Sequence, residues 1–378
     1  MNPVILEIKQ IGDRLALYIP RKILLSLNLK KGDNIKIIIK KGKNSYELFS
    51  KFNYLISLTR DSILNLNLKK GEEVNIYFEK LQKNPNSNSL FNKGKIDLLF
   101  LIPNKTSKEN EIVIDELEEN SDRWLKIKSF HNRGSSKLIK LKRFVDPYIL
   151  GCFLGQLQSE GTKSFNEKLE FCNKSLQEHL DFVESLIYLG TPKQKILAKL
   201  DCDKDMKNIE EEIFKFQNKV GLNVKYIGKS SISRNGFGFK SFVRSTIFAE
   251  LILFFMDSLR DKIKQDIIED NMVPFADGFI AKVLNGDGTI YIINRGNHRI
   301  LQARLSIADG NYNYLEDYKK ILEKYGLKPH INKKQKCVRS YLNYQSAKKL
   351  LSIGAFNNNP NHEKLILFIN NLEAHGYK

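Results

Sequence analysis

The sequence of 378 residues contains little of what several protein classes require. Its 4 cysteines lie far apart with no CxxC pair, so neither a zinc site nor a disulfide framework is predicted. Its 6 histidines form no HxH or HExxH cluster, and its glycines form no phosphate-binding loop or dinucleotide fingerprint. The longest apolar run, residues 251–256, is too short to cross a bilayer. We therefore expect a cytoplasmic protein in a reducing setting, without membrane contact.

Positive charge is abundant instead. Lys and Arg number 62 against 43 Asp and Glu, which gives a formal net charge of +19. Such an excess is the electrostatic footprint of a protein that binds nucleic acid. On charge alone, the alternative is a soluble basic protein without that partner.

An internal repeat occupies the first 80 residues. The hexapeptide LNLKKG occurs at residues 27–32 and 66–71, a spacing of 39 residues. Around each copy we predict a short strand, a basic turn into a short helix, and a second strand, namely strands 15–20, 34–39, 54–59 and 73–78 and helices 21–27 and 60–66. One copy alone cannot cover the apolar face of its own strands, so the two copies are predicted to pair into one small barrel.

The repeated pattern, a strand ending in IPR or LTR and then L-x-L-K-x-G-D/E, resembles the AbrB/SpoVT family of swapped-hairpin DNA-binding domains. In that family two chains normally supply the two halves, whereas here one chain carries both. Residues 1–95 hold 18 basic and 8 acidic residues. The resemblance therefore implies DNA contacts, with Arg21 and Arg60 at the helix starts. A barrel that mediates only protein contacts is the alternative.

Changes in composition set the other boundaries. Residues 82–95 are polar and rich in turn-forming residues, and residues 96–139 carry 7 basic against 8 acidic residues, so this region is not expected to lie on phosphates. We predict four parts: a DNA-binding barrel at 1–81, a linker or connector at 82–137, and two further repeats at 138–270 and 271–378.

Two short segments in these further repeats share one pattern. FLGQLQSEG (153–161) and IAKVLNGDG (280–288) are each a mostly apolar, helix-like run that ends in an acid and a glycine. A glycine just past a helix end can take the left-handed conformation that closes the last turn, so the helices are predicted to stop at Glu160 and Asp287. Cations are favoured at a helix C-terminus, so an acid in both copies predicts a bound divalent metal. The alternative is a pair of solvent-facing acids.

These segments resemble the two LAGLIDADG motifs of single-chain homing endonucleases, also called the DOD type. The resemblance covers residues 138–378 and implies an α+β fold, in which tandem αββαββα repeats with saddle-shaped antiparallel sheets follow the small β-rich, AbrB-like barrel. Gly155 occupies the family's small interface position in the first motif, but Lys282 occupies it in the second and is expected to hinder close approach of the two helices. Gln158 and Asn285 replace the first acid of the family motif.

The resemblance further implies a site-specific DNA endonuclease that hydrolyses phosphodiester bonds with Mg²⁺ or Mn²⁺ held by Glu160 and Asp287. A nearby cation usually assists in the family, and Lys240 and Arg339 are candidates. The implied partner is double-stranded DNA, bound by a monomer with internal pseudo-two-fold symmetry. The expected DNA contacts are Arg21, Arg60, Lys163, Lys168, Arg244, Arg295, Arg299, Gln302 and Arg304.

Periodicity supports the second repeat more clearly than the first. In ILQARLS, Ala303 and Leu305 fall on a packing face, and Gln302 and Arg304 fall on the opposite face, where DNA could be read. The first repeat is predicted to contain an extra basic helical segment at 193–220. Two other functions stay open, a non-cleaving transcriptional regulator on the same scaffold and an RNA splicing-assistance protein. The ends carry no splicing junctions, so a free-standing protein is predicted and not an intein.

Overall fold

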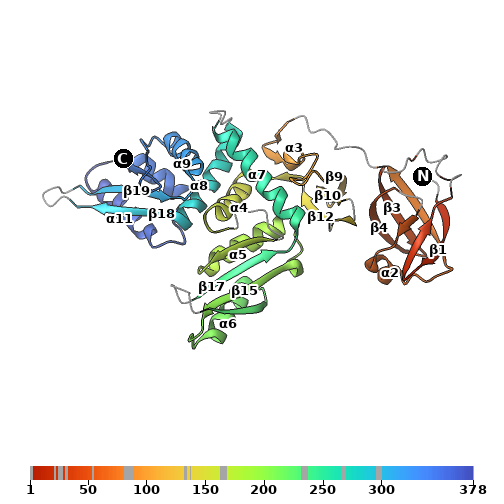
Figure 1. Cartoon of the computed structure of the whole chain (residues 1–378). Helices are drawn as coiled ribbons and strands as arrows, with labels where there is room; N and C mark the ends of the chain where they lie inside the picture. The colour runs from red at the N-terminus through yellow and green to blue at the C-terminus, as the bar shows by residue number, and fades with distance from the viewer. Residues whose placement is uncertain are drawn as a thin grey trace. The chain divides into compact units, whose positions relative to one another are not determined.

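The computed structural model is a mixed α+β protein with several antiparallel sheets (Figure 1). It describes residues 3–20, 23, 29, 33–52, 55–80, 89–131, 134–136, 138–161, 168–230, 237–264, 270–294 and 300–377. The chain divides into two units, one made of Met1–Asn86, Pro103–Glu119 and Trp124–Ile139, the other of Ser87–Ile102, Asn120–Arg123 and Lys140–Lys378. Within the described ranges, no helix is both long enough and apolar enough to span a bilayer.

The first unit is built on a six-stranded sheet with the strand order β4-β3-β6-β1-β2-β5. Its elements are β1 (Val4–Ile11), β2 (Arg14–Tyr18), β3 (Asn34–Lys41), β4 (Asn44–Lys51), β5 (Leu55–Ser57), α2 (Arg60–Leu66) and β6 (Glu73–Lys80). The strands predicted around the repeat and the helix at 60–66 are confirmed. The predicted helix at 21–27 lies, apart from Ile23, outside the described residues.

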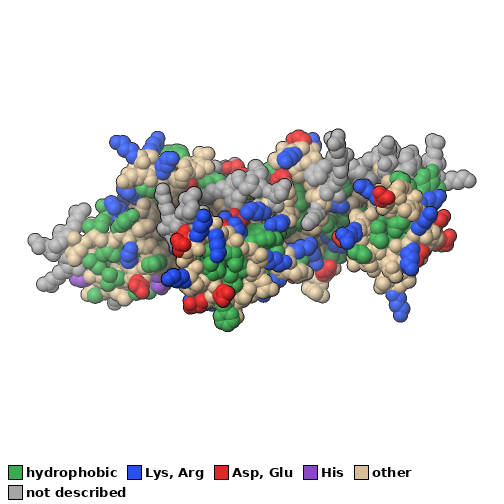
Figure 2. Space-filling model, turned by 60° about the horizontal axis from the view of Figure 1, so that its bottom comes forward, with side chains coloured by type: hydrophobic (Ala, Val, Ile, Leu, Met, Phe, Trp, Pro, Cys, Tyr) green, Lys and Arg blue, Asp and Glu red, His purple; other side chains and the backbone are tan. Residues whose placement is uncertain are grey.

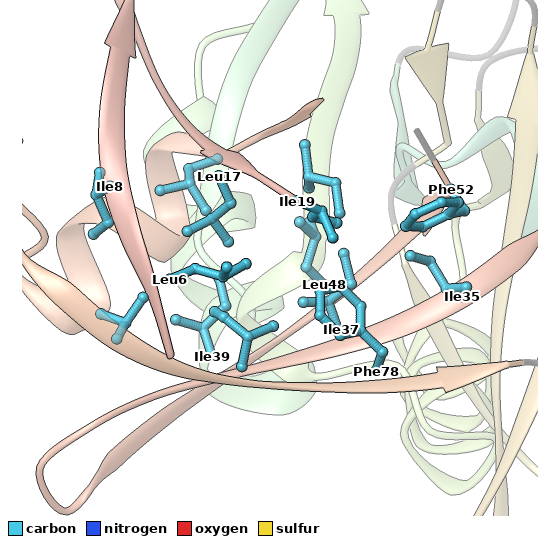
Figure 3. Close-up of a cluster of buried hydrophobic side chains, with 14 of the residues drawn as sticks. Leu6, Ile8, Leu17, Ile19, Ile35, Ile37, Ile39, Leu48, Phe52 and Phe78 are labelled. Carbon is cyan, nitrogen blue, oxygen red and sulfur yellow. The ribbon is translucent and has the colours of Figure 1, made fainter. Parts of the chain in front are cut away.

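The two repeat copies pair with each other. β2 runs antiparallel to β5 with Leu17 opposite Ile56, and β3 runs antiparallel to β6 with Ile38 opposite Tyr77. In both residue pairs the two residues are 39 positions apart, which is the repeat spacing, so they are equivalent residues of the two copies. Each antiparallel strand pair is therefore centred on a local two-fold axis. Apolar side chains from both copies, including those labelled in Figure 3, fill one buried cluster. Each copy therefore covers the apolar face of the other.

The segment predicted to be a connector contains two long strands. β9 (Glu111–Glu119) and β10 (Asp122–His131) pair with each other. The Asp115 carboxylate lies 2.8 Å from the Lys36 ammonium of β3, and Lys126 forms an ion pair with Glu47 of β4. The acidic composition of this segment thus neutralises lysines of the first unit. Residues 82–88 of the predicted linker lie outside the described residues.

The second unit contains two repeats of similar order, each with a four-stranded sheet. The first consists of α4 (Pro147–Glu160), β14 (Leu169–Asn173), α5 (Leu176–Tyr188), β15 (Ile196–Asp203), α6 (Ile209–Val220), β16 (Val224–Ser230), β17 (Phe237–Val243) and α7 (Thr246–Lys264). The second consists of α8 (Val273–Asp287), β18 (Gly288–Ile293), β19 (Gln302–Ala308), α9 (Tyr312–Lys324), β20 (His330–Asn332), β21 (Cys337–Tyr341), α10 (Tyr344–Ser352) and α11 (Asn361–Ala374).

Short elements complete the chain. They are β7 (Phe91–Asn92), β8 (Lys95–Asp97), α3 (Leu98–Leu101), β11 (Gly134–Ser135), β12 (Ile139–Lys142), β13 (Phe144–Val145) and the 3₁₀ turns Lys193–Lys195 and Asp270–Met272. The sheets of the two repeats have the orders β14-β17-β15-β16 and β18-β19-β21-β20.

The prediction of an extra helical segment at 193–220 was wrong for its first half. Residues Ile196–Asp203 alternate between buried and outward side chains and form β15, which pairs antiparallel to β17. Only Ile209–Val220 is helical, and its first turn is acidic, with three glutamates. The elements added to this repeat are α6 and β16, and β16 runs parallel to β15 at the sheet edge.

A buried histidine lies in the core of the first repeat. His179 has no exposed surface and contacts the rings of Phe171, Phe216 and Phe239. Its Nε2 lies 3.0 Å from the Asn173 carbonyl, which can only accept, so Nε2 carries the proton and Nδ1 accepts from the Ser241 hydroxyl at 2.9 Å. One neutral tautomer satisfies both bonds. Burial is the main cause that lowers the pKa of His179 to about 4.

This histidine predicts an acid-sensitive core. As pH falls, the unfolded chain takes up a proton near pH 6.5, whereas the folded chain resists until about pH 4. The free energy of unfolding should therefore fall by about 3 kcal/mol between these two pH values. Urea unfolding of His179→Gln across this range should lack that decrease. The matched change of exposed His375 to Gln should retain it, and identical pH dependence in both variants would contradict the prediction.

Candidate active site

Helices α4 and α8 carry the two motifs and lie between the two repeats (Figure 1). Most side chains on every side of these helices are buried, because each helix packs against its own repeat and against the other helix. Both helices have a proline in the first turn, where its missing N–H is no loss. The Asp146 carboxylate caps α4 by accepting from the backbone of Tyr148 and Ile149.

Glycines allow the two helix backbones to touch. A Cβ at Gly155 would lie 2.3 Å from the carbonyl oxygen of Phe279, and a Cβ at Gly278 would lie 2.3 Å from that of Tyr148. Real Cβ atoms essentially never come so close to backbone. Contacts advance along both helices in the same direction, up to Ser159 against Gly286, so the two C-termini lie at one end of the pair.

Lys282 does not keep the helices apart, contrary to expectation. Its Cβ lies 3.1 Å from where a Gly155 Cβ would be, and its ammonium reaches α5, 3.0 Å from both Glu178 carboxylate oxygens and 2.6 Å from Asp181. Burial favours the neutral amine, but the charges of Glu178 and Asp181 and their hydrogen bonds outweigh burial and raise the pKa of Lys282. The lysine stem leaves the helix interface and ties α8 to the first repeat.

The helices end at Glu160 and Asp287, as predicted, but the glycines that follow do not close them in the predicted way. Gly161 has φ −97° and Gly288 has φ −82°, both extended and not left-handed. A Cβ at Gly161 would lie 2.6 Å from the backbone of Leu157, and one at Gly288 would lie 2.5 Å from the Leu284 carbonyl oxygen. These glycines are needed because the chain folds back against its own helix as it enters the sheet.

The two acids are neighbours across the helix pair. A Cβ at Gly286, the residue before Asp287, would lie 3.3 Å from Cγ of Glu160. Asp287 also lies near Tyr318 of α9. The pKa of Tyr318 is raised well above its usual value, mainly by burial, then by the charge and hydrogen bond of Asp309, and further by the charge of Asp287. Both carboxyl groups thus lie at the same end of the pair, one beside each sheet.

The carboxylates of Glu160 and Asp287 fit a metal ion that takes few of its ligands from the protein. No group of three or more His, Cys, Asp or Glu that could hold a metal occurs in the described part of the chain. Mg²⁺ commonly takes only one or two protein carboxylates and completes its shell with water and substrate phosphate oxygens. Glu160 and Asp287 therefore fit Mg²⁺ that is bound together with a phosphate, and they do not fit a metal held by protein side chains alone.

The amides that replace the first motif acid connect each helix to the opposite repeat. Gln158 of α4 donates to Asp309 of the second repeat at 3.2 Å. Asn285 of α8 donates to Glu178 of the first repeat at 3.2 Å. The exchange is reciprocal, so the C-terminal ends of both helices are tied to both repeats.

Sequence reasoning missed the acceptors of this exchange. Glu178 is 5% exposed and accepts from Gln156, Lys282, Asn285 and Asn358. Its position, three residues after Ser175, indicates the first turn of α5 but not its role at the repeat interface. Only the spatial arrangement brings these five side chains together.

The two predicted assisting cations occupy non-equivalent positions. Lys240 of β17 lies opposite Cys172, whereas Arg339 of β21 lies opposite Ser306. Lys240 is also engaged by Asp201 at 3.0 Å and by Glu170 at 3.6 Å. Burial favours its neutral form, but the Asp201 hydrogen bond and both acids outweigh burial and raise its pKa.

The structure places five of the predicted DNA-contact residues. Gln302 and Arg304 point outward from β19, as predicted, with Ala303 and Leu305 buried behind them. Lys168 and Arg244 both lie over the ring of Phe242, at 5.4 and 5.6 Å. Arg60 begins α2 of the first unit. The remaining four, Arg21, Lys163, Arg295 and Arg299, lie outside the described residues.

The glycine contacts predict a large and local effect. Gly155→Ala should destabilise the protein by about 2 kcal/mol or more, because the methyl group can be accommodated only by moving the backbone of α8. Gly310→Ala is the matched control, since a Cβ there would meet nothing within 4 Å. Thermal unfolding should show a clear drop in midpoint for the first and almost none for the second. Equal midpoints would mean that the helices do not pack this closely.

The second unit thus holds a pair of packed helices that end in acids, between two four-stranded sheets. Solved structures to which this chain is similar include full-length DUF199/WhiA from Thermatoga maritima, with 11% identity and a TM-score of 0.34, over 61% of this chain and 62% of that chain. The LAGLIDADG homing endonuclease I-LtrWI bound to target DNA has 11% identity and a TM-score of 0.32, and it covers 60% of this chain and 91% of its own.

The meganuclease I-SmaMI bound to uncleaveable DNA is similar at 8% identity and a TM-score of 0.33, over 60% of this chain and 88% of its own. The matched region spans less than two thirds of the WhiA chain. No protein-family model and no curated protein matches this sequence significantly. Likenesses this weak carry no conclusion about function, which has to be inferred from the residues of the site.

Proposed function

We propose that this protein binds double-stranded DNA across the two sheets of its second unit and cleaves it with a divalent metal at the paired helix ends. The observation that carries the proposal is the pair of acids, Glu160 and Asp287, at adjacent ends of closely packed helices. Two carboxylates at helix C-termini repel each other and the helix dipoles unless a cation lies between them. The net charge of +19 supports a polyanionic partner.

The metal, Mg²⁺ or Mn²⁺, would activate a water molecule and neutralise charge on the scissile phosphate. Glu160 and Asp287 would supply its protein ligands. Gln158 and Asn285 hold the two helix ends in register with the two sheets, and hence with the duplex lying on them. Arg339 remains a candidate for a direct contact with the DNA. For Lys240 we propose a different role, which is to neutralise the acids of the first sheet, because its ammonium already forms ion pairs with Asp201 and Glu170.

Both halves of the pseudo-symmetric unit come from one chain, so we propose that the protein acts as a monomer. We also propose that it acts in the cytoplasm. The first unit would bind DNA outside the cleavage site, with Arg60 among its contacts. The pairing of its two repeat copies is what supports the resemblance to AbrB-type domains.

A DNA-binding regulator that does not cleave is the second candidate. One observation favours it: the paired repeat of the first unit resembles a family of DNA-binding domains, which would bind DNA without cleaving it. Both candidates predict the same salt-dependent DNA binding, and they differ only in whether the DNA is cleaved.

DNA binding itself has a direct test. If the Lys and Arg side chains scattered over the face in Figure 2 neutralise six to ten phosphates, affinity should fall about 1000-fold or more between 50 and 200 mM salt. Binding to a randomised duplex library, measured across this range, checks the slope. The same library incubated with Mg²⁺ or Mn²⁺ then separates the candidates. Nicked or cut molecules support the endonuclease, salt-dependent binding without cutting supports the regulator, and a flat salt dependence contradicts both.

A further inference from the structure

The outward faces of the two sheets carry opposite chemistry. We define the first open face as Lys168, Glu170, Lys199, Asp201 and Lys240, and the second open face as Tyr291, Gln302, Arg304, Ser306, Arg339 and Tyr341. Cross-strand register places each set on one side of its sheet: Lys199 and Cys172 flank Lys240, while Tyr291 and Tyr341 flank Arg304. The opposite side of each sheet packs on helices.

The second open face presents guanidinium groups without carboxylates. Among the described strand residues that point outward from this sheet, none is Asp or Glu. Arg304 lies over the Tyr291 ring at 5.3 Å. The Nε atoms of Arg304 and Arg339 are buried with no hydrogen-bond partner among the described residues.

The first open face is a chain of alternating charges. Glu170 pairs with Lys168 and lies 3.6 Å from Lys240, and Asp201 lies 3.0 Å from Lys240 and 2.6 Å from Lys199. Burial favours protonation of Asp201, but the hydrogen bonds from Lys199 and Lys240 outweigh it and lower its pKa. The Asp201 carboxylate is thus charged at neutral pH, and each lysine of this face already has an acidic partner.

Stability does not explain this arrangement. Ion pairs between partly exposed side chains contribute little to folding, typically about 0 to 1 kcal/mol. On a surface that lies against DNA, carboxylates also repel phosphates. This repulsion is offset only where the carboxylates accept hydrogen bonds from base edges. In the major groove the donors available to them are the amino groups of cytosine and adenine, whereas arginine pairs with the N7 and O6 acceptors of guanine.

We propose that the two half-sites of the DNA target are read by opposite chemistry: Arg304 and Arg339 read guanines on one half, and Glu170 and Asp201 accept from cytosine amino groups on the other. This inference rests on the proposed DNA-binding function. The preferred target is then non-palindromic despite the pseudo-symmetry of the protein. The half-site on the second open face supplies most of the salt-dependent affinity, because the lysines of the first open face are already neutralised.

The test is selection from a randomised duplex library with the full-length protein and four variants. Arg304→Gln and Asp201→Asn should each lose about 10-fold preference at a base position, and the two positions should fall in opposite half-sites. Arg304→Lys keeps the charge but not the bidentate fork, so it should retain the salt slope and lose the guanine preference. Lys215→Gln, on exposed α6, is the control and should leave the selected sequence unchanged.

Each result has one reading. Selected sequences with guanine preference in one half and cytosine preference in the other support the inference. A palindromic consensus, or variants whose effects fall in the same half, would overturn it while leaving DNA binding intact. Absence of any selected sequence together with salt-independent binding would overturn the proposed function as well.

Discussion

Glu160→Gln and Asp287→Asn are each expected to slow metal-dependent DNA cleavage by about 1000-fold or more, while binding stays unchanged or becomes slightly tighter. The amides keep the shape of the side chains but are not hard anionic ligands, so several kcal/mol of charge stabilisation in the transition state is lost. Removing a negative charge beside a phosphate relieves repulsion when no metal is bound. Rates of nicking and cutting on a selected target, with binding measured in parallel, check both halves of the prediction.

The control for this experiment is an acid on the same unit but away from the helix pair. Glu323→Gln, half-exposed near the end of α9, should change neither rate nor affinity. If the wild type binds a defined sequence tightly but never nicks it with any divalent metal, the endonuclease proposal fails and the regulator takes its place. If only one of the two acids proves essential, the two helix ends do not share the chemistry.

Local sequence signals were enough to predict the elements that position the site. An acid before glycine indicated where the two motif helices end, because helix termination depends on neighbouring residues. The period-two pattern of β19, with Ala303 and Leu305 buried, was also predicted correctly. These signals require no knowledge of the tertiary fold.

The signals that failed depend on contacts between distant residues. β15 was mistaken for helix because a short alternating run beside helix-forming residues is ambiguous by periodicity alone. Gly161 and Gly288 were assigned the wrong backbone conformation, since the steric reason for glycine is the chain's return against Leu157 and Leu284. The partners of Lys282 could not be predicted, because Glu178 and Asp181 lie about a hundred residues away in sequence.

Lys282→Met should destabilise the second unit by about 3 to 5 kcal/mol, since the change removes the cation from two acids at the repeat interface. The lysine side chain is 11% exposed and that of Glu178 is 6% exposed, so water cannot replace the lost partner at Glu178. Urea unfolding followed by far-UV circular dichroism measures the loss. Lys215→Met is the matched control, because Lys215 is 49% exposed and its pairs with Glu211 and Glu212 lie on the surface. That change should cost less than about 1 kcal/mol.

A double-mutant cycle with Glu178→Gln separates the ion pair from simple loss of packing. If the Lys282 ammonium is there to balance the buried carboxylate, the double variant should be more stable than the sum of the two single losses predicts, because neither charge is then left unpaired. Additive losses would assign Lys282 a packing role only. The Lys282→Met variant should also weaken specific DNA binding more than nonspecific binding, since the two sheets would lose their fixed spacing without losing any outward-facing charge.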